Sequence, residues 1–436
     1  MNVVAPPRPP APEDLDALIE EARRRARRRR LAYGLCLLCL GVAAGLYFGI
    51  NRGGGAGGDR HVAHGPGPAP PAAEAREIAR VGARTVIGEA GLIAPGLGWA
   101  MNGLGFWWTR DGGAHWRTIT PPQVRASGDV VARVFDVAAT DDDHIWIAAA
   151  DIAGGRQGRH MAIERTSDGG KTWQSTVPAG CDVCAGAHLS FVDDRTGFAL
   201  AGARPSPRLY ETGDGGVSWR VVRSNVSFTG PIRFATASDG WAVSDPGKMI
   251  GPSQSVPVGG GIVYRTRDGG RTWRRVALAV PASYRGRAAT AGVPRFFGAR
   301  AGVIAVRFRD RSGAQHVIVC VTIDGGQTWT VRAAPASADV RAQSWGFPEA
   351  LPFSAATVDD WFLLVGHNLY ATHDRGLSWS AIRTVAPQAP HAWDVDFTSP
   401  TTGWAIFAPY ETGPRAGAAL VKTTDGGRHW RPLAPR

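Results

Sequence analysis

The sequence predicts an all-β fold, a ring of seven four-stranded sheets, preceded by one membrane-spanning helix. Three observations support this: a motif T-x-D-x-G-x-x-W that occurs seven times, a composition rich in glycine and proline, and one uncharged stretch near the N-terminus. The chain has 436 residues, including 57 Gly and 31 Pro, and 44% of its residues are hydrophobic. Such a composition argues against an all-helical protein and against a disordered chain.

Charge and cysteine content exclude two further classes. The 49 Lys+Arg exceed the 37 Asp+Glu, and nearly all basic residues are arginine. Either a genome that favours arginine codons or a surface suited to anionic partners explains this excess, because arginine offers a planar fork for carboxylate or phosphate. The arginines are dispersed, so nucleic acid is not an expected partner. Five cysteines are too few for a disulfide-dense scaffold.

Residues 1–30 predict a basic helical arm, and residues 31–50 a membrane span. Acidic residues near Pro12 suit the start of a helix and Arg23–Arg30 suit its end. The uncharged residues 31–50 can span roughly 30 Å, the hydrocarbon thickness of a bilayer. Seven arginines precede the span within eight residues, whereas Arg52 alone follows closely. The positive-inside rule therefore places the N-terminus in the cytoplasm and the rest of the chain outside.

A cleaved signal peptide is the alternative for this segment. Its apolar stretch would be unusually long, and no small-residue cleavage site follows Ile50. Residues 51–80 are rich in glycine and then proline, which predicts a flexible tether. We therefore expect a single-pass protein of the bacterial inner membrane whose folded domain, residues 81–436, faces the periplasm or the cell exterior.

The repeated motif predicts a self-contained hairpin turn. The carboxylate can accept hydrogen bonds from amides across the turn, the glycines permit positive φ, and the tryptophan can fold back over the hairpin. Only the sixth copy departs, with Arg375 at the first glycine position. We therefore interpret all seven aspartates as structural rather than as catalytic residues or metal ligands. They are Asp111, Asp168, Asp214, Asp268, Asp324, Asp374 and Asp425.

Each turn belongs to a unit of about fifty residues that reads as four strands of five to seven residues. The second strand of each unit is expected to start at an aromatic residue, except in the weaker fifth unit, where Val303 stands. Four strands every fifty residues predict a propeller blade, so the fold class is a seven-bladed β-propeller of four-stranded blades. Two modes of closing the ring remain open: packing of the last blade on the first, or an outer strand from residues 75–85.

Long irregular segments are predicted only after second and fourth strands, at the edge opposite the repeated turns. They are residues 150–159, 244–260, 308–315, 408–416, 178–187, 277–294, 332–351 and 383–392. Because binding commonly resides in variable loops on a fixed scaffold, we expect the functional surface there. Its candidate residues are Tyr284, Arg285, Arg287, Arg295, Arg309, Arg311, Trp345, His391, Trp393 and Tyr410. The alternative is a solvated arginine-rich rim with tryptophans tucked beneath loops.

The C-x-x-C pair Cys181 and Cys184 lies in one of these predicted loops. A local disulfide is favoured because the outer compartment should be oxidising. Zinc would require four ligands, and only His188 is near. Dithiol catalysis would require a helix start, which the pattern lacks. Cys320, in a strand that looks buried, is expected to be a free thiol in the core.

The repeat resembles the Asp-box, or BNR, motif of the sialidase-like superfamily over residues 85–436. Its glycine–tryptophan–alanine second strands are most similar to the propellers of the photosystem II stability and assembly factor family. That resemblance implies a non-catalytic platform, without a cofactor or metal, that binds an envelope protein or complex, with an anionic partner as one option. The cytoplasmic arm and the membrane span depart from the family and put photosystem work in doubt.

A glycoside hydrolase or a glycan-binding protein is the alternative function. Hydrolysis would require two carboxylates that converge about 5 to 10 Å apart. The acidic residues of the predicted loops are scattered along the sequence, and no pair is marked; they are Asp151, Asp245, Asp310, Glu349 and Glu411. A binding role is therefore favoured over an enzymatic one.

Overall fold

The computed structural model describes the chain from residue 87 to residue 435 with internal gaps. The described ranges are 87–102, 105–122, 133–151, 160–181, 187–202, 207–243, 263–278, 281, 289–309, 315–335, 352–365, 368–384, 391–408 and 419–435. The predicted arm, membrane span and tether lie outside them and stay predictions. In these ranges, no helix has the length and apolar character needed to cross a membrane.

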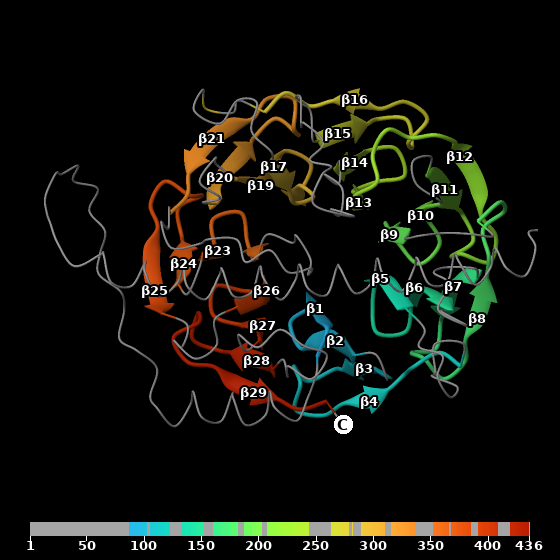
Figure 1. Ribbon diagram of the computed structural model, residues 1–436, viewed down its shortest axis with the longest axis horizontal. Coiled ribbons are helices and arrows are strands. Elements are labelled where there is room, and N and C mark those ends of the chain that lie inside the picture. The colour runs from blue at the N-terminus through green and yellow to red at the C-terminus, as the bar shows by residue number, and fades with distance from the viewer. Residues whose placement is uncertain are drawn as a thin grey trace, which may run out of the picture. The chain divides into compact units, whose positions relative to one another are not determined.

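The described residues form seven antiparallel sheets arranged in a ring, one for each unit predicted from the repeat (Figure 1). Blades 1 to 3 consist of β1 (Glu89–Ala94), β2 (Leu97–Asn102), β3 (Gly105–Thr109) and β4 (Arg117–Thr118); β5 (Arg133–Ala139), β6 (Ile145–Asp151), β7 (His160–Thr166) and β8 (Gln174–Thr176); and β9 (Ala187–Phe191), β10 (Gly197–Ala201), β11 (Arg208–Thr212) and β12 (Arg220–Arg223).

Blades 4 to 7 follow in chain order. They consist of β13 (Ile232–Phe234), β14 (Gly240–Val243), β15 (Val263–Thr266) and β16 (Arg274–Arg275); β17 (Ala289–Ala291), β18 (Arg295–Phe297), β19 (Ala301–Arg309), β20 (Gln315–Thr322) and β21 (Thr330–Ala333); β22 (Phe353–Ala355), β23 (Trp361–Val365), β24 (Asn368–Thr372) and β25 (Ser380–Thr384); and β26 (His391–Phe397), β27 (Gly403–Ala408), β28 (Ala419–Thr423) and β29 (Arg431–Leu433). The first strand of each blade lies nearest the centre of the ring, and the last strand lies outermost (Figure 1).

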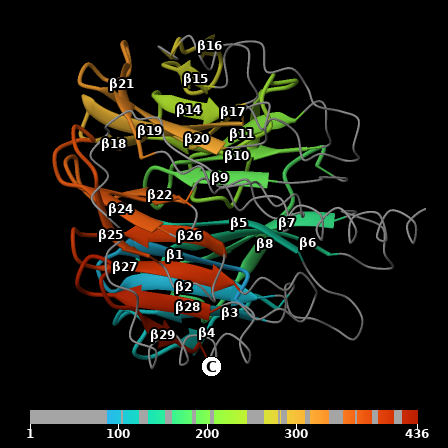
Figure 2. The same cartoon turned by 60° about the vertical axis from the view of Figure 1, so that its left-hand side comes forward.

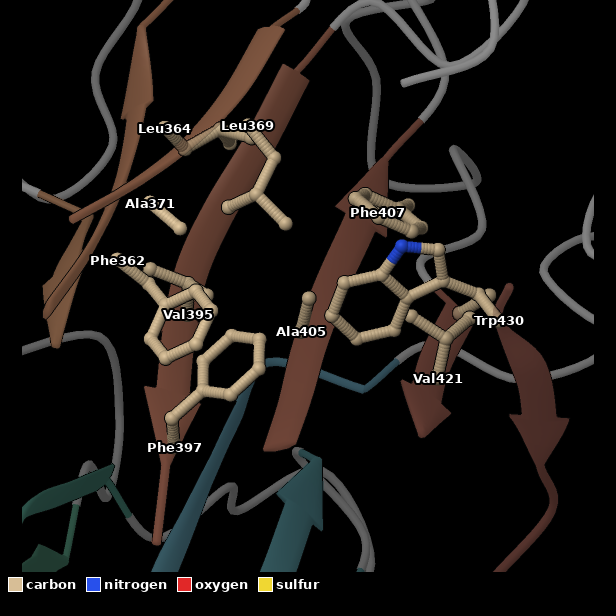
Figure 3. Packing of buried hydrophobic residues seen from close by; sticks show 11 residues of the cluster. Phe362, Leu364, Leu369, Ala371, Val395, Phe397, Ala405, Phe407, Val421 and Trp430 are labelled. Atoms are coloured by element: carbon tan, nitrogen blue, oxygen red, sulfur yellow. The ribbon is translucent and has the colours of Figure 1, made fainter. Parts of the chain in front are cut away.

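Strand alternation explains how the blades pack. Along β27, Trp404 and Ile406 face the first blade, whereas Ala405 and Phe407 face the sixth. Alternate side chains of a strand point to opposite faces of its sheet, so one second strand contributes to two interfaces. Figure 3 shows the second of these, where Phe397 stacks on a phenylalanine of β23, Phe362, with ring centroids 3.6 Å apart. The core is therefore a circle of interfaces between sheets.

A glycine at the start of several second strands makes room for the aromatic ring of the neighbouring inner strand. A Cβ on Gly403 would lie 2.6 Å from the Phe397 ring, and one on Gly240 would lie 2.5 Å from the Phe234 ring. The inner-strand ring can therefore lie flat across its own sheet and stack on the preceding blade. This explains the glycine–tryptophan pattern of the sequence. The stacked pairs are Trp146–Phe191, Phe198–Phe234, Trp241–Phe296 and Phe362–Phe397.

Within the described residues, the ring is closed by packing and hydrogen bonds between blade 7 and blade 1. Each of these blades has four strands of its own, and their sheets lie side by side (Figure 2). The Trp404 ring covers Gly98, where a Cβ would lie 2.6 Å from it. Lys422 Nζ donates to the carbonyl of Gly112 at 2.9 Å. Of the two modes of closure predicted, these contacts are those of blade-to-blade packing.

The structure differs from the sequence prediction in two respects. Residues 277–294 were expected to be a loop, but β17 lies within them, and Arg295 begins β18 rather than lying in that loop. Both short strands pair with β19, so the inner strand of blade 5 is split around Pro294, which lacks an amide donor for the ladder. In addition, β4 and β16 have two residues each, shorter than predicted, because an outer strand has a neighbour on one side only.

Candidate functional site

The seven repeats, called aspartate turns below, share one set of hydrogen bonds. In the fourth, Thr266 Oγ1 donates to Asp268 Oδ1 at 2.8 Å and accepts from the amide of Gly270 at 2.8 Å. The amide and hydroxyl of Thr272 donate to the two carboxylate oxygens of Asp268 at 2.9 and 2.5 Å. The other six copies repeat these four bonds, with Ser or His in place of the last Thr in some. Each carboxylate is therefore engaged within its own turn.

The sixth copy keeps the same backbone despite its arginine. Arg375 adopts a φ of 61°, a left-handed conformation that glycine occupies in the other six turns. Its Nε donates to Asp359 Oδ1 at 2.5 Å, across to the neighbouring turn of the same blade. The geometry of the turn thus tolerates the one departure from the motif.

These bonds lower the pKa of the turn aspartates. The hydroxyls of Thr172, Ser218 and Thr272, followed by the backbone amides of the same residues, lower the pKa of Asp168, Asp214 and Asp268 to about 2. A carboxylate that accepts several hydrogen bonds is stabilised in its charged form. At neutral pH these aspartates are ionised acceptors, which suits a structural role and not that of a proton donor.

We expect acid to destabilise the ring through these turns. Because the folded pKa of each aspartate lies below its unfolded value, the stabilisation is complete above about pH 5 and is lost as pH falls from about 4 towards 2. Urea unfolding between pH 6 and pH 2 should show a flat region followed by a steep decline. Asp268→Asn should be less stable at pH 6 and should show a shallower decline. Equal slopes for the two proteins would contradict this account.

Four of the predicted binding residues are described. Three of them lie at the edge of the ring opposite the aspartate turns, whereas Arg295, on β18 and paired with Val303 near the start of β19, lies towards the aspartate turns instead. Arg309 ends β19, and His391 and Trp393 lie at the start of β26. A second strand ends, and a first strand begins, at the edge away from these turns, so the fold brings the three positions to one edge. The other candidates are outside the described residues; they are Tyr284, Arg285, Arg287, Arg311, Trp345 and Tyr410.

The two described cysteines are buried. Cys181 takes part in a disulfide bond and packs beside Tyr210. Position 184 lies outside the described residues, so the Cys181–Cys184 pairing remains a prediction. Cys320 is free, and burial raises the pKa of its thiol to about 12. This thiol is therefore unreactive at neutral pH.

The centre of the ring contains a set of residues of which the sequence reasoning singled out only Arg295. They are inner-strand residues at the same level of each blade. Each is paired with the second-strand residue that corresponds to Trp241 of blade 4. In blade order these central positions are Gly91, Ala138, Ser190, Arg233, Arg295, Ser354 and Asp396. Aligning the seven repeats on their glycine–tryptophan dipeptides would have revealed these positions, because Arg233 then aligns with the serines and the aspartate of other blades.

Three central positions bind the inner strand of the next blade. Ser190 Oγ accepts from the amide of Phe234, and Ser354 Oγ from the amide of Phe397, both at 2.8 Å. Asp396 Oδ2 accepts from the amide of Leu92 at 2.8 Å and so links the last blade to the first. Burial raises the pKa of Asp396, although these bonds and the charge of Arg295 act in the opposite direction. We call these contacts the inter-blade bonds.

A fourth inter-blade bond, the second to a carboxylate, comes from Asp136, two residues before the central position of blade 2. Asp136 Oδ2 accepts from the amide of Leu189 at 2.9 Å, and His188 Nδ1 lies 3.7 Å from the same oxygen. The two acidic groups of the centre therefore both bind backbone. Over the described part of the chain, no group of three or more His, Cys, Asp or Glu side chains is placed to hold a metal ion.

No protein-family model and no curated protein matches this chain. Solved structures do: YCF48 bound to a D1 peptide is 18% identical, with 70% of this chain and 84% of that chain covered and a TM-score of 0.44. YCF48 from Cyanidioschyzon merolae is 15% identical, with coverage of 70% and 86% and a TM-score of 0.44. The GH74 xyloglucanase from Xanthomonas campestris is 15% identical, with coverage of 81% and 68% and a TM-score of 0.36.

These likenesses are likenesses of fold. The ring of seven sheets makes this chain a seven-bladed β-propeller.

Proposed function

We propose that this protein is a non-catalytic binding platform, tethered to the inner membrane, that holds an envelope protein at the edge of the propeller opposite the aspartate turns. One observation supports this above the others. The aspartate turns engage their own carboxylates at one edge, while the long, irregular connections of the sequence follow second and fourth strands, at the other edge. The second edge therefore holds the segments that differ from blade to blade.

The residue types at that edge suit a protein partner. Arg309 and His391, from blades 5 and 7, and Trp393 occupy strand ends there. Arginine and tryptophan are enriched among residues that dominate binding energy at protein interfaces. Residues 31–436 carry a formal net charge of +9, because eight Arg and five acidic residues, +3 of the chain's +12, lie in residues 1–30. A positive domain favours association with an anionic partner and makes that association sensitive to salt.

The proposal is tested by cross-linking the full-length protein in intact envelopes, with and without Arg285→Ala plus Arg287→Ala. We expect the double variant to lose its cross-linked partner, and high salt to weaken capture by the unaltered protein. Arg271→Ala plus Arg428→Ala is the matched control, because these arginines donate to carbonyls of their own aspartate turns at 2.7 and 3.0 Å. Loss of the partner in the control alone would overturn the assignment of the edge.

Glycoside hydrolysis is the competing function, and a turnover assay separates the two. At the centre of the ring, the carboxylates of Asp136 and Asp396 both accept backbone amides of a neighbouring blade. Residues 81–436 should therefore leave a panel of aryl glycosides and sialosides unhydrolysed. Turnover that exceeds the background rate would refute the non-catalytic proposal.

The membrane tether is part of the proposal and has its own test. It is supported by the uncharged residues 31–50 and by the arginines that precede them. The full-length protein should remain in the membrane pellet after alkaline carbonate extraction, and the propeller should be accessible to protease from the outer side of the inner membrane. Release into the soluble fraction would exclude the tether.

A further inference from the structure

The central positions are not occupied by the same chemistry around the ring. Ser190, Ser354 and Asp396 each accept the amide that follows the central position of the next blade. Arg233 and Arg295 stand at the same level in the two consecutive blades between them. A guanidinium group has donors only and accepts no amide. Blades 4 and 5 therefore have cations where other blades form inter-blade bonds.

The two arginines stand at equivalent positions of neighbouring inner strands and have few partners. The side chain of Arg233 is exposed and, in the described part of the chain, makes no hydrogen bond and no ion pair. The guanidinium of Arg295 lies over the ring of Phe297, 5.7 Å from its centroid. The surrounding protein and the positive charge of Arg295 lower the pKa of Arg233. Like charges at one level of neighbouring blades repel each other, and an anion bound beside them would relieve that repulsion.

The acidic residues of the centre do not supply that counter-ion by direct contact. Asp396 and Asp136 attract Arg233 electrostatically. Their oxygens, however, accept the amides of Leu92 and Leu189, in blades 1 and 3. These aspartates offset part of the positive charge while leaving the donors of Arg233 open. The arrangement therefore favours a compact anion on the side of blades 4 and 5.

We propose that Arg233 and Arg295 form a binding site for an oxyanion at the centre of the propeller. Carboxylate and phosphate groups match the guanidinium fork, which can donate two parallel hydrogen bonds to one such group. The ligand is either a free small anion with two or more carboxylate or phosphate groups or an acidic side chain of a protein. The site lies on inner strands, near the edge of the ring that holds the aspartate turns. The proposed platform lies at the opposite edge, so the two sites are distinct.

The test is calorimetric titration of the full chain with three probes: citrate, inorganic phosphate and hexaglutamate. We expect saturable binding that Arg233→Gln and Arg295→Gln each weaken at least tenfold. Arg233→Lys, which keeps the charge but not the fork, should weaken it less. The control Arg300→Gln removes an arginine of blade 5 that donates to the carbonyl of Ile323, and it should bind as the unaltered protein does.

The probes identify the source of the anion. Binding of citrate or phosphate supports a small-molecule ligand, and binding of hexaglutamate alone supports an acidic protein side chain. No binding of any probe, or equal binding by the two Gln variants and the unaltered protein, would overturn the site.

Two further measurements separate this site from folding and from the platform. Without added anion, Arg233→Gln should unfold at the same or a higher temperature, because one of two like charges is removed; a marked fall would assign Arg233 a structural role instead. Loss of partner cross-linking with Arg285→Ala plus Arg287→Ala, but not with Arg233→Gln, would support the proposed platform independently of the anion site.

Discussion

Trp404→Ala is expected to lower the free energy of unfolding by about 3–5 kcal/mol, the cost of removing a large buried aromatic side chain. Trp404 is 2% exposed, covers Gly98 of blade 1 and lies beside Trp116, with ring centroids 5.7 Å apart. It thus fills the interface at which the last blade meets the first. Urea denaturation followed by far-ultraviolet circular dichroism measures the loss.

The location of Trp404 at the closing interface leads to a second, more specific expected result. In the described residues no strand is shared between blades 1 and 7, so packing and a few side-chain hydrogen bonds close the ring. Hydrogen exchange in β1 and β28 should therefore accelerate more than exchange in β14 and β15. Trp361→Ala, at the interface of blades 5 and 6, is the matched control, because Trp361 is 1% exposed. Equal acceleration in all blades of the Trp404 variant would argue against a special role in closure.

Glu164→Gln is expected to stabilise the protein at pH 7 by about 1–3 kcal/mol, because it removes a buried negative charge and with it the penalty for taking that charge out of water. Glu164 is 1% exposed on β7. Its Oε1 accepts from Ser175 Oγ at 2.8 Å, whereas Oε2 is buried without a hydrogen bond in the described structure. Glutamine keeps the acceptor and removes the buried negative charge.

The pH dependence of this effect identifies its cause. Burial raises the pKa of Glu164, so its favourable contribution is complete below the unfolded pKa and is lost as pH rises through the folded value. The difference in unfolding free energy between Glu164→Gln and the unaltered protein should therefore increase with pH from about 4 upwards. Subtracting the two curves cancels the contribution of the aspartate turns. A difference independent of pH would show that packing, and not charge, is responsible.

Much of the fold could be predicted from the sequence because the repeat acts locally. Each aspartate turn satisfies its own polar groups within eight residues, so Thr266 and Asp268 form the same bonds as their counterparts in the other blades. The turns fix where third and fourth strands meet, and the aromatic starts of second strands fix the rest of the blade. The exception was blade 5, where Val303 replaces the aromatic and the inner strand is split. There the local signal was weakest and the prediction least accurate.

The candidate site could be predicted only in part, for a physical reason. Strand order predicted the edge at which Arg309, His391 and Trp393 lie. Arg309 and His391 were expected in loops, however, and belong to β19 and β26. Their identity as binding residues stays a prediction.

By itself, then, the sequence determined the seven blades, the aspartate turns and the edge at which the chain varies, because short-range hydrogen bonds and strand alternation specify them. Only the tertiary structure decided how the ring closes and what meets at its centre. The amide of Leu92 donates to Asp396 although 304 residues separate them, and the charge of Arg295 acts on Arg233 from another blade. Such contacts exist only once seven inner strands converge on one axis; an alignment of the repeats can give the residues that share one level, but not the contacts that they make across the ring.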